Sequence, residues 1–434
     1  MEWKIYKKSN FVIFDFQNLL RSFSIMETTL PRLFRKVARE YPDIAFQMSR
    51  FNDGHFEPTT YKEAYENMVA FAGGLLSMGV QREEHIGLIS DNRKEWQQAD
   101  MGLLMIGAID VPRGCDATIG DLEYILSFAE CKIVIVENSS QVGKILGIRE
   151  KLPLVTTLIE FEEPTDKDVE SARNAGIELL SFSSILERGV AFNKENPSKV
   201  EEEMEKGKWD DLATIIFTSG TTGQPKGVML SHGNFITQLD EVDERIFLYP
   251  GDRGLLVLPI WHAFERAVEY VVCSQAATLC YSKPVGPILL ADLQTLNPQV
   301  VPAVPRVFEA VYDGIFKKMR KTGGIANMVF KFFTNIALFH SKLDRVLFGK
   351  TSRFGYDMRW LQWPAFVIPW LVCYPIKLLG GVLVFRKIRK MMGNNFRSAV
   401  AGGGALPPAV DKFFWAIGIK LVEGYGLTET SPIV

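Results

Sequence analysis

The chain contains few of the residues that build disulfide frameworks and metal clusters. Its 434 residues include five cysteines and five histidines. The cysteines are widely spaced, odd in number and form no Cys-x-x-Cys pair, which indicates reduced thiols in a cytoplasmic protein. The histidines are scattered, without the spacing of metal ligands. We therefore expect neither a disulfide scaffold nor a metal cluster.

An excess of charge of one sign is also missing. Lys plus Arg number 49 and Asp plus Glu number 51, a formal net charge of −2. This balance argues against a nucleic-acid-binding surface spread over the whole protein. Hydrophobic residues make up 47% and charged residues 23%, as in a folded globular protein. Repeats and low-complexity tracts are absent from the sequence.

The N-terminus lacks the features of a signal peptide. Its apolar stretch is too short and too broken by charge for the apolar region that precedes a cleavage site. From Met26 the sequence reads as a fresh start, with Thr28 or Thr29 placed to cap a helix. We interpret residues 1–25 as a non-native extension and residues 26–434 as the protein proper.

Apolar runs with strand and helix periodicity alternate along most of the chain. This alternation predicts β-α-β units and an α/β fold with largely parallel sheets. Strands are expected at residues 86–89, 108–111, 132–136, 212–217, 228–230, 255–259, 398–400 and 420–422. Helices are expected at residues 64–78, 96–106, 121–129, 232–247, from 306 onward and at 410–416. The acidic, lysine-containing run at 193–208 is interpreted as a solvated loop.

The most specific pattern is a decapeptide that follows the predicted strand at 212–217. Its glycines let the backbone bend and approach a ligand, and its hydroxyls and lysine are suited to bind phosphate oxygens. The Walker spacing differs, since it places Ser or Thr after the lysine. The alternative is a flexible surface turn. The ten residues are Thr218, Ser219, Gly220, Thr221, Thr222, Gly223, Gln224, Pro225, Lys226 and Gly227.

A second pattern, Gly424 to Thr430, follows the predicted strand at 420–422. Loops at the carboxyl ends of strands bind ligands in open α/β sheets. Glu429 could hold Mg²⁺, which takes few carboxylates, and Tyr425 offers a flat face to an adenine ring. The alternative is a loop that carries a surface glutamate.

Two further segments also follow predicted strands. Gly402, Gly403 and Gly404 follow the strand at 398–400 and allow a flat ring or an acyl chain to approach bare backbone. His262 lies just past a strand and a proline. A lone histidine is more often an ordinary surface or packed residue than a catalyst.

Together these segments resemble the AMP-forming acyl- and aryl-CoA synthetases of the adenylate-forming superfamily. The stretch around His262, which reads Pro-x-x-His-Ala-Phe-Glu-Arg, resembles the long-chain fatty acid branch, as does Val304-Pro305-Arg306 with Glu309. The resemblance implies two αβα subdomains and catalytic roles for His262, Lys226, Thr428 and Glu429. It also implies Mg²⁺ ligation by Glu429 and Thr221. The nucleotide-binding residues it implies are Thr218, Ser219, Gly220, Thr221, Thr222, Gly223, Lys226, Gly402, Gly403, Gly404, Tyr425, Gly426 and Thr428.

The implied reaction joins a fatty acid to CoA through an acyl-AMP intermediate, with ATP and Mg²⁺ and without nucleic acid. The sequence departs from the family after Val434, where the ribose-binding Thr-Gly-Asp segment and the C-terminal lid would follow. We therefore expect a truncated chain with little ligase activity. Two rivals stay open: an enzyme that passes the acyl group to a carrier protein, and a non-catalytic nucleotide- or lipid-binding remnant.

The segment 360–385 is apolar and about long enough to span a bilayer. Prolines cut it, although spanning helices tolerate proline, and a basic run follows it at residues 386–390. Leu383 and Ile388 fit one helical face. The plainest interpretation is buried core or tunnel cover. A transmembrane helix and peripheral contact with the inner face of the membrane through 360–390 are the alternatives.

Overall fold

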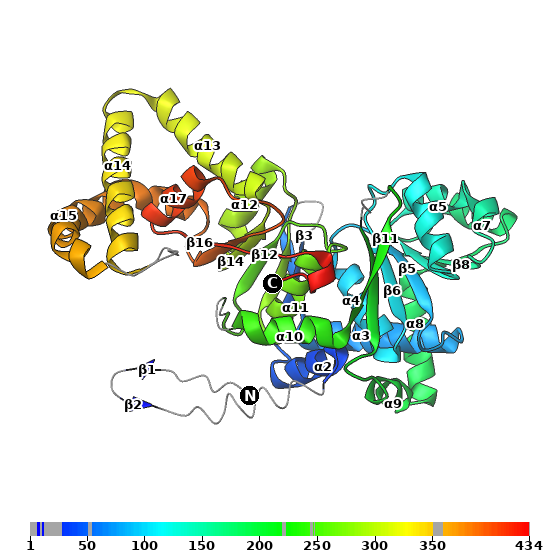
Figure 1. The fold of residues 1–434 in the computed structure, drawn as a ribbon. Coiled ribbons are helices and arrows are strands. Elements are labelled where there is room, and N and C mark those ends of the chain that lie inside the picture. The colour runs from blue at the N-terminus through cyan, green and yellow to red at the C-terminus, as the bar shows by residue number, and fades with distance from the viewer. Residues whose placement is uncertain are drawn as a thin grey trace. The chain divides into compact units, whose positions relative to one another are not determined.

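A computed structural model of the chain describes residues 7–8, 11–12, 28–50, 54–218, 223–243, 246, 248–349 and 359–433 (Figure 1). The chain divides into two compact units. The first comprises the residues up to Ile44 with Thr59–Phe247 and Glu269–Gln275. The second comprises Ala45–Pro58, Leu248–Val268 and Ala276–Val434. Each unit is built on a seven-stranded sheet, which confirms the predicted α/β class.

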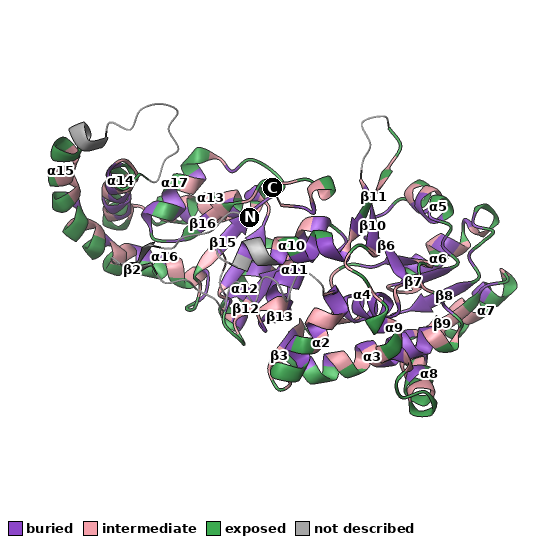
Figure 2. Ribbon diagram, turned by 60° about the horizontal axis from the view of Figure 1, so that its bottom comes forward, coloured by how far each residue is buried: buried purple, intermediate pink, exposed green. Residues whose placement is uncertain are grey.

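The sheet of the first unit has the strand order β11-β10-β6-β5-β7-β8-β9. All neighbours pair in parallel except β10 and β11, which are antiparallel. Its central strands are buried on both faces (Figure 2), as the continuous apolar runs in the sequence predict. The strands are β5 (His85–Ile89), β6 (Ile109–Arg113), β7 (Ile133–Val136), β8 (Thr157–Glu160), β9 (Glu178–Ser181), β10 (Leu212–Thr218) and β11 (Lys226–Ser231).

Helices connect these strands, and several begin at side-chain caps. Thr60 and Thr118 each form a capping box with the acidic residue three positions later, which satisfies helical N–H groups that have no intrahelical partner. The helices are α2 (Leu30–Glu40), α3 (Tyr61–Ser77), α4 (Lys94–Ile106), α5 (Ile119–Phe128), α6 (Ser139–Leu146), α7 (Asp166–Asn174), α8 (Phe182–Glu195), α9 (Lys199–Glu205) and α10 (His232–Asp243), with the 3₁₀ turn η1 (Arg149–Lys151).

Glycine lets α3 and α8 pack closely in the first unit. A Cβ atom at Gly189 of α8 would lie 1.6 Å from the carbonyl oxygen of Ala70 in α3. A Cβ atom at Gly74 of α3 would lie 2.3 Å from the carbonyl oxygen of Ile185. The two backbones can therefore approach one another only because these positions carry no side chain.

The sheet of the second unit has the order β16-β15-β14-β12-β13-β3-β4. The pairs from β16 to β3 are all parallel. As a result, the loops after β12, β14, β15 and β16 leave from one edge of the sheet. The strands are β3 (Ala45–Arg50), β4 (Phe56–Thr60), β12 (Arg253–Leu256), β13 (Thr278–Tyr281), β14 (Val300–Ala303), β15 (Ser398–Ala401) and β16 (Lys420–Glu423).

The helices of the second unit share one apolar core with this sheet. Phe308, Phe330, Phe385 and Phe413 are all buried in that core. The helices are α12 (Gly286–Leu296), α13 (Pro305–Thr322), α14 (Gly324–Leu347), α15 (Arg359–Gly380), α16 (Arg386–Met391) and α17 (Pro408–Ala416), with the π-helical turn η2 (Gly381–Phe385) and the 3₁₀ turn η3 (Thr428–Thr430). Helix α11 (Ala263–Ser274) starts in the second unit and ends in the first.

The prediction of a loop at 193–208 is wrong, although most of the run lies on the surface as predicted. Most of the run is helical, in the end of α8 and in α9, and Val200 and Met204 are buried. The acidic side chains pair with arginines of α2: Arg35 with Glu201 and Glu205. The charged run is therefore mostly helical: α9 buries one apolar side and pairs its carboxylates with arginines of α2.

At the N-terminus, Thr29 occupies the N-cap of α2 as predicted, but its side chain makes no capping hydrogen bond. Only Lys7–Lys8 and Phe11–Val12, which pair as the short strands β1 and β2, are described from the segment 1–25. Its interpretation as a non-native extension otherwise lies outside the described residues.

The interpretation of the apolar segment as buried cover is also wrong. One helical stretch, Trp363–Met391, is long and apolar enough to cross a membrane by length and composition, and 11% of its apolar window is buried. Ile388 is buried as predicted, whereas Leu383 is exposed. Figure 2 accordingly draws much of α15 in green.

Candidate active site

The predicted phosphate-binding loop joins two antiparallel strands of the first unit. β10 ends at Thr218, which lies opposite Lys226, the first residue of β11. The loop thus leaves the end of a buried strand, as predicted. Gly223 has φ +91°, which favours glycine, and Lys226 is exposed. The predicted ligands Ser219, Gly220, Thr221 and Thr222 lie outside the described residues.

The other three predicted segments leave strands of the parallel sheet in the second unit. His262 follows β12, Gly402 to Gly404 follow β15, and Gly424 to Thr430 follow β16. Because these strands belong to one parallel array, the segments share its carboxyl edge (Figure 1). The N–H of Gly402 donates to the carbonyl oxygen of Ala303 at 3.2 Å, and the N–H of Gly424 donates to that of Ala401 at 2.8 Å. These bonds extend the sheet pairing into the loops and fix where each loop begins.

The glycine segment lies against the start of α11. A Cβ atom at Gly402 would come within 2.8 Å of the Phe264 ring, so the ring rests directly on the backbone. Gly403 has φ +77°, and both Gly403 and Gly404 are exposed. The structure therefore brings the segment around His262 and the glycine segment together, with bare backbone open to a ligand.

His262 is exposed at the first turn of α11. Its ring stacks on Trp261 with centroids 4.5 Å apart, and its carbonyl oxygen accepts the N–H of Arg266 at 3.1 Å. The N–H of His262 donates to the carbonyl oxygen of Pro259 at 3.0 Å. The backbone on both sides of the imidazole is thus held in place.

Glu265 supports this loop and had no role in the sequence-based prediction. The side chain is buried, and its Oε1 accepts the N–H of Leu258 at 3.3 Å. Burial raises the pKa of Glu265 well above its ordinary value, because a buried carboxylate loses its hydration. The sequence signal was the position of Glu265 in the first turn of α11, seven residues after Leu258, whose N–H it binds.

The last segment is a tight turn that only glycine permits. A Cβ atom at Gly426 would lie 1.5 Å from the carbonyl oxygen of Pro432. The Leu427 N–H donates to Thr430 Oγ1 at 2.9 Å, which closes the 3₁₀ turn that carries Thr428 and Glu429. Just before the turn, Glu423 Oε1 accepts the N–H of Leu406 at 3.0 Å. This bond ties the end of β16 to the chain that follows the glycine segment, a link that sequence reasoning missed.

The turn presents groups that fit a nucleotide and a hard cation. Tyr425 is 72% exposed, so its ring face is open to stacking. Glu429 is exposed, and its carboxylate forms no hydrogen bond or ion pair with the described part of the chain. An exposed carboxylate beside hydroxyl groups is an oxygen donor set of the type that Mg²⁺ prefers.

Comparison with known proteins identifies the family. The model for "AMP-binding enzyme" matches residues 34–434. The chain belongs to the AMP-binding enzyme family. Its fold is that of the N-terminal domain of adenylate-forming enzymes: the N-terminal domain of FACL13 from Mycobacterium tuberculosis superposes with a TM-score of 0.61 at 18% identity, covering 93% of this chain and 77% of that one.

The curated relatives of this AMP-binding enzyme include fatty acid ligases. A chloroplastic long-chain-fatty-acid–[acyl-carrier-protein] ligase, AEE15, of Arabidopsis thaliana is 29% identical over 414 residues, covering 93% of this chain and 56% of the relative. The long-chain-fatty-acid–CoA ligase FadD15 of Mycobacterium tuberculosis is 27% identical over 395 residues, covering 91% and 59%. The chain thus spans a little over half the length of these relatives.

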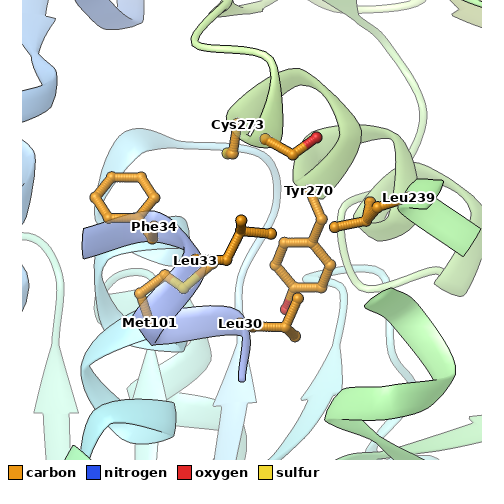
Figure 3. Close-up of a pocket in the computed structure, with 8 residues that line it drawn as sticks. Leu30, Leu33, Phe34, Met101, Leu239, Tyr270 and Cys273 are labelled. Atoms are coloured by element: carbon orange, nitrogen blue, oxygen red, sulfur yellow. The ribbon is translucent and has the colours of Figure 1, made fainter. Parts of the chain in front are cut away.

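Two hollows in the first unit contain none of the predicted site residues. One, lined by Phe34, Met101 and Tyr270 among others, has a volume of about 10 Å³ (Figure 3), which is room for little more than one water. The other is a polar hollow of about 270 Å³ that includes Arg82 and Asp211. The first is too small for an acyl chain or a nucleoside.

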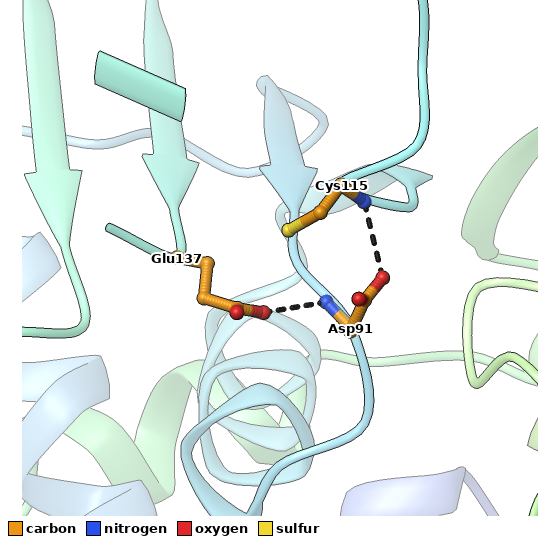
Figure 4. A group of neighbouring side chains, drawn as sticks. All are labelled: Asp91, Cys115 and Glu137. Atoms are coloured by element: carbon orange, nitrogen blue, oxygen red, sulfur yellow. Dashed lines mark hydrogen bonds between the residues drawn. The ribbon is translucent and has the colours of Figure 1, made fainter. Parts of the chain in front are cut away.

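A cluster of Asp91, Cys115 and Glu137 follows β5, β6 and β7 of the first unit (Figure 4). Their ligand atoms lie within 4.8 Å of one another, a grouping that the spacing of cysteines in sequence could not reveal. Asp91 Oδ1 accepts the Cys115 N–H at 3.1 Å, and Glu137 Oε2 accepts the Asp91 N–H at 2.8 Å. Burial and the two carboxylates raise the pKa of the Cys115 thiol, which disfavours the thiolate that metal binding requires. The cluster therefore fastens three loops.

Proposed function

We propose that this chain carries the ATP-dependent adenylation site of a long-chain fatty acid ligase. The observation that supports it most is the arrangement of the second unit, where three segments that suit an acid, an adenine ring and a hard cation leave one edge of a parallel sheet. Family membership supports the AMP-forming chemistry. The names of the relatives support a long-chain fatty acid as the substrate.

The first half of the reaction forms a mixed anhydride. A carboxylate oxygen of the fatty acid attacks the α-phosphorus of ATP, and the bond to pyrophosphate breaks. Lys226 and the hydroxyl-rich loop before it would hold the outgoing phosphates, while Thr428 would bind the α-phosphate. His262, fixed by its backbone bonds, would orient the carboxylate. Mg²⁺, held by Glu429 with Thr221, would supply positive charge to the phosphates. Such reactions depend mainly on positioning and charge neutralisation.

The second half transfers the acyl group to a thiol, with release of AMP and loss of the thiol proton. We propose CoA as the acceptor. The resemblance to a ligase that is named for an acyl carrier protein favours the phosphopantetheine thiol of such a carrier as the second candidate. The five cysteines are all free thiols, in keeping with a cytoplasmic site for this chemistry.

Pyrophosphate release and acyl-AMP formation test the proposal. Incubation with ATP, Mg²⁺ and palmitate should yield acyl-AMP by mass spectrometry; CoA or a carrier protein is then added, to identify which thiol accepts the acyl group. Glu429→Gln should lower the rate by about 10²-fold or more if the carboxylate positions the cation. Glu178→Gln, on an exposed glutamate of the first unit, is the matched control.

The products distinguish the candidates. Transfer to a carrier protein but not to CoA would select the second acceptor. ATP binding without acyl-AMP at any fatty acid chain length would contradict adenylation and leave a nucleotide-binding remnant.

A further inference from the structure

Helices α14 and α15 of the second unit pack together through one face of α15. The Trp370 Nε1–H donates to Asp344 Oδ1 at 3.3 Å. The His340 ring lies 5.3 Å from Trp370 and 5.7 Å from Tyr374, centroid to centroid. Cys373 is buried beside them. This face of α15 is therefore already occupied by the protein.

Between Trp363 and Gly380 the opposite face of α15 carries no charged residue. Every exposed residue from 363 to 383 is apolar or aromatic, and the positions recur at helical spacing. A surface helix of a soluble protein places polar residues at such positions. Tyr374 is partly exposed but its ring belongs to the side that faces α14. We call the other exposed residues, which continue from α15 into η2, the outer apolar face: Trp363, Pro364, Ala365, Ile368, Leu371, Val372, Pro375, Leu378, Leu379, Val382 and Leu383.

The sequence on both sides of α15 is strongly basic. Residues 314–410 contain 16 lysines and arginines but only two acidic residues, Asp344 and Asp357, although the whole chain carries a net charge of −2. The exposed Arg386, Lys387 and Lys390 follow directly after the outer apolar face. Apolar surface bordered by basic side chains is complementary to a bilayer with anionic head groups.

We propose that the outer apolar face of α15 docks this protein on an anionic lipid surface, with the helix lying in the membrane interface. Such helices bury their apolar side about 5–10 Å deep and keep their basic residues at the head groups. The helix lies on the bilayer and does not cross it, because a spanning helix is apolar all round whereas the face with Trp370 and Lys377 packs against α14. The inference does not rest on the proposed function.

Vesicle flotation tests the proposal. The full chain should float with vesicles of phosphatidylcholine and phosphatidylglycerol and much less with phosphatidylcholine alone. Leu371→Glu with Leu378→Glu should weaken binding by more than about tenfold, since each buried leucine contributes the equivalent of roughly a tenfold change or more. The triple variant Arg386→Gln, Lys387→Gln, Lys390→Gln should weaken binding to anionic vesicles by about 10²-fold, at about fivefold per charge.

Val190→Glu is the matched control, because Val190 is a similarly exposed apolar residue on a helix of the first unit. It should float as the wild type does. All variants replace exposed side chains, and circular dichroism confirms that each is folded. Quenching of Trp363 fluorescence by lipids brominated at shallow positions, lost in Trp363→Phe, should place the helix in the interface.

Three results would overturn the proposal. The first is flotation that the Leu371 and Leu378 changes leave intact. The second is quenching of Trp363 strongest at the bilayer centre, which would indicate a spanning helix. The third is a smaller sedimentation mass of the Leu371→Glu, Leu378→Glu variant in the absence of lipid, which would assign the face to a second copy of the chain.

Discussion

The turn after β16 gives the sharpest test of the candidate active site, through the substitution Gly426→Ala. The added methyl would lie 1.5 Å from the carbonyl oxygen of Pro432, 2.5 Å from its carbonyl carbon and 3.0 Å from Ile433 Cα. Ordinary van der Waals contacts begin near 3.4 Å. The backbone must therefore move by about 2 Å, because no flexible side-chain end can yield.

The movement should act on catalysis more than on folding. Overpacking of this kind costs about 1–3 kcal/mol where the structure cannot relax. Pro432 is buried, but Tyr425, Leu427 and Glu429 in the turn are exposed, so the turn has room to shift. Thr428 and Glu429 follow the substituted residue within three positions. A displacement of about 1 Å at a reacting centre can cost about 10²-fold in rate. We therefore expect a loss of at least that size, with a small change in melting temperature.

The assay is ATP–pyrophosphate exchange with a long-chain fatty acid at saturating Mg²⁺. Gly424→Ala is the matched control, because its methyl would meet nothing closer than 3.9 Å, and we expect it to retain most of the activity. Equal rates for Gly426→Ala and the wild type would refute the reasoning. So would an equal loss in Gly424→Ala, since that would show sensitivity to any side chain in the turn.

Other positions give independent tests. Gly189→Ala should lower the free energy of unfolding by about 1–3 kcal/mol or more in urea titrations, because its methyl would lie 1.6 Å from the Ala70 carbonyl oxygen. The control is Gly143→Ala, whose methyl would lie in open space within α6. It should be neutral or stabilising by up to about 1 kcal/mol. Glu265→Ala removes the acceptor of the Leu258 N–H and should destabilise by about 1–3 kcal/mol, whereas the neutral acceptor in Glu265→Gln should restore most of the loss. Burial and the neighbouring Asp168 raise the pKa of Glu160 from 4.5 to about 7. Between these two pH values the folded state therefore holds a proton that the unfolded state has lost. The free energy of unfolding should fall as pH rises through this range. Glu160→Gln should flatten that slope in unfolding measured at pH 5 and pH 8, and an unchanged slope would contradict the assignment.

The sequence predicted β5, β6, β7, β10, β11, β12, β15 and β16, because these strands depend on local signals, but it predicted no strand at β3, β4, β8, β9, β13 or β14. The apolar run Ser398–Ala401, for example, ends at Gly402, so its limit is visible without a structure. Parallel pairing then places every loop that follows a strand at the same edge. That rule agrees with the grouping of His262, Gly402 and Glu429, which the sequence analysis drew from the family resemblance.

Contacts between distant residues could not be predicted in this way. The glycine at 402 is required by Phe264, and Gly189 is required by Ala70. The run at 193–208 was misjudged because its charges were counted without regard to face. Val200 and Met204, four residues apart, were the local signal of a buried stripe, and its partners in α2 lie more than 160 residues earlier.

The apolar segment shows why composition alone could not assign its environment. Pro364, Pro369 and Pro375 each remove a helical hydrogen bond, and they argued for interruption. In the structure the helix continues through them, because Trp370 and Cys373 between the prolines anchor one side of it against α14. Since the anchored side carries the polar contacts, the apolar residues that suggested burial are left on the outside. The orientation of the helix, which only tertiary packing sets, therefore turns a sequence typical of a core into an exposed apolar surface.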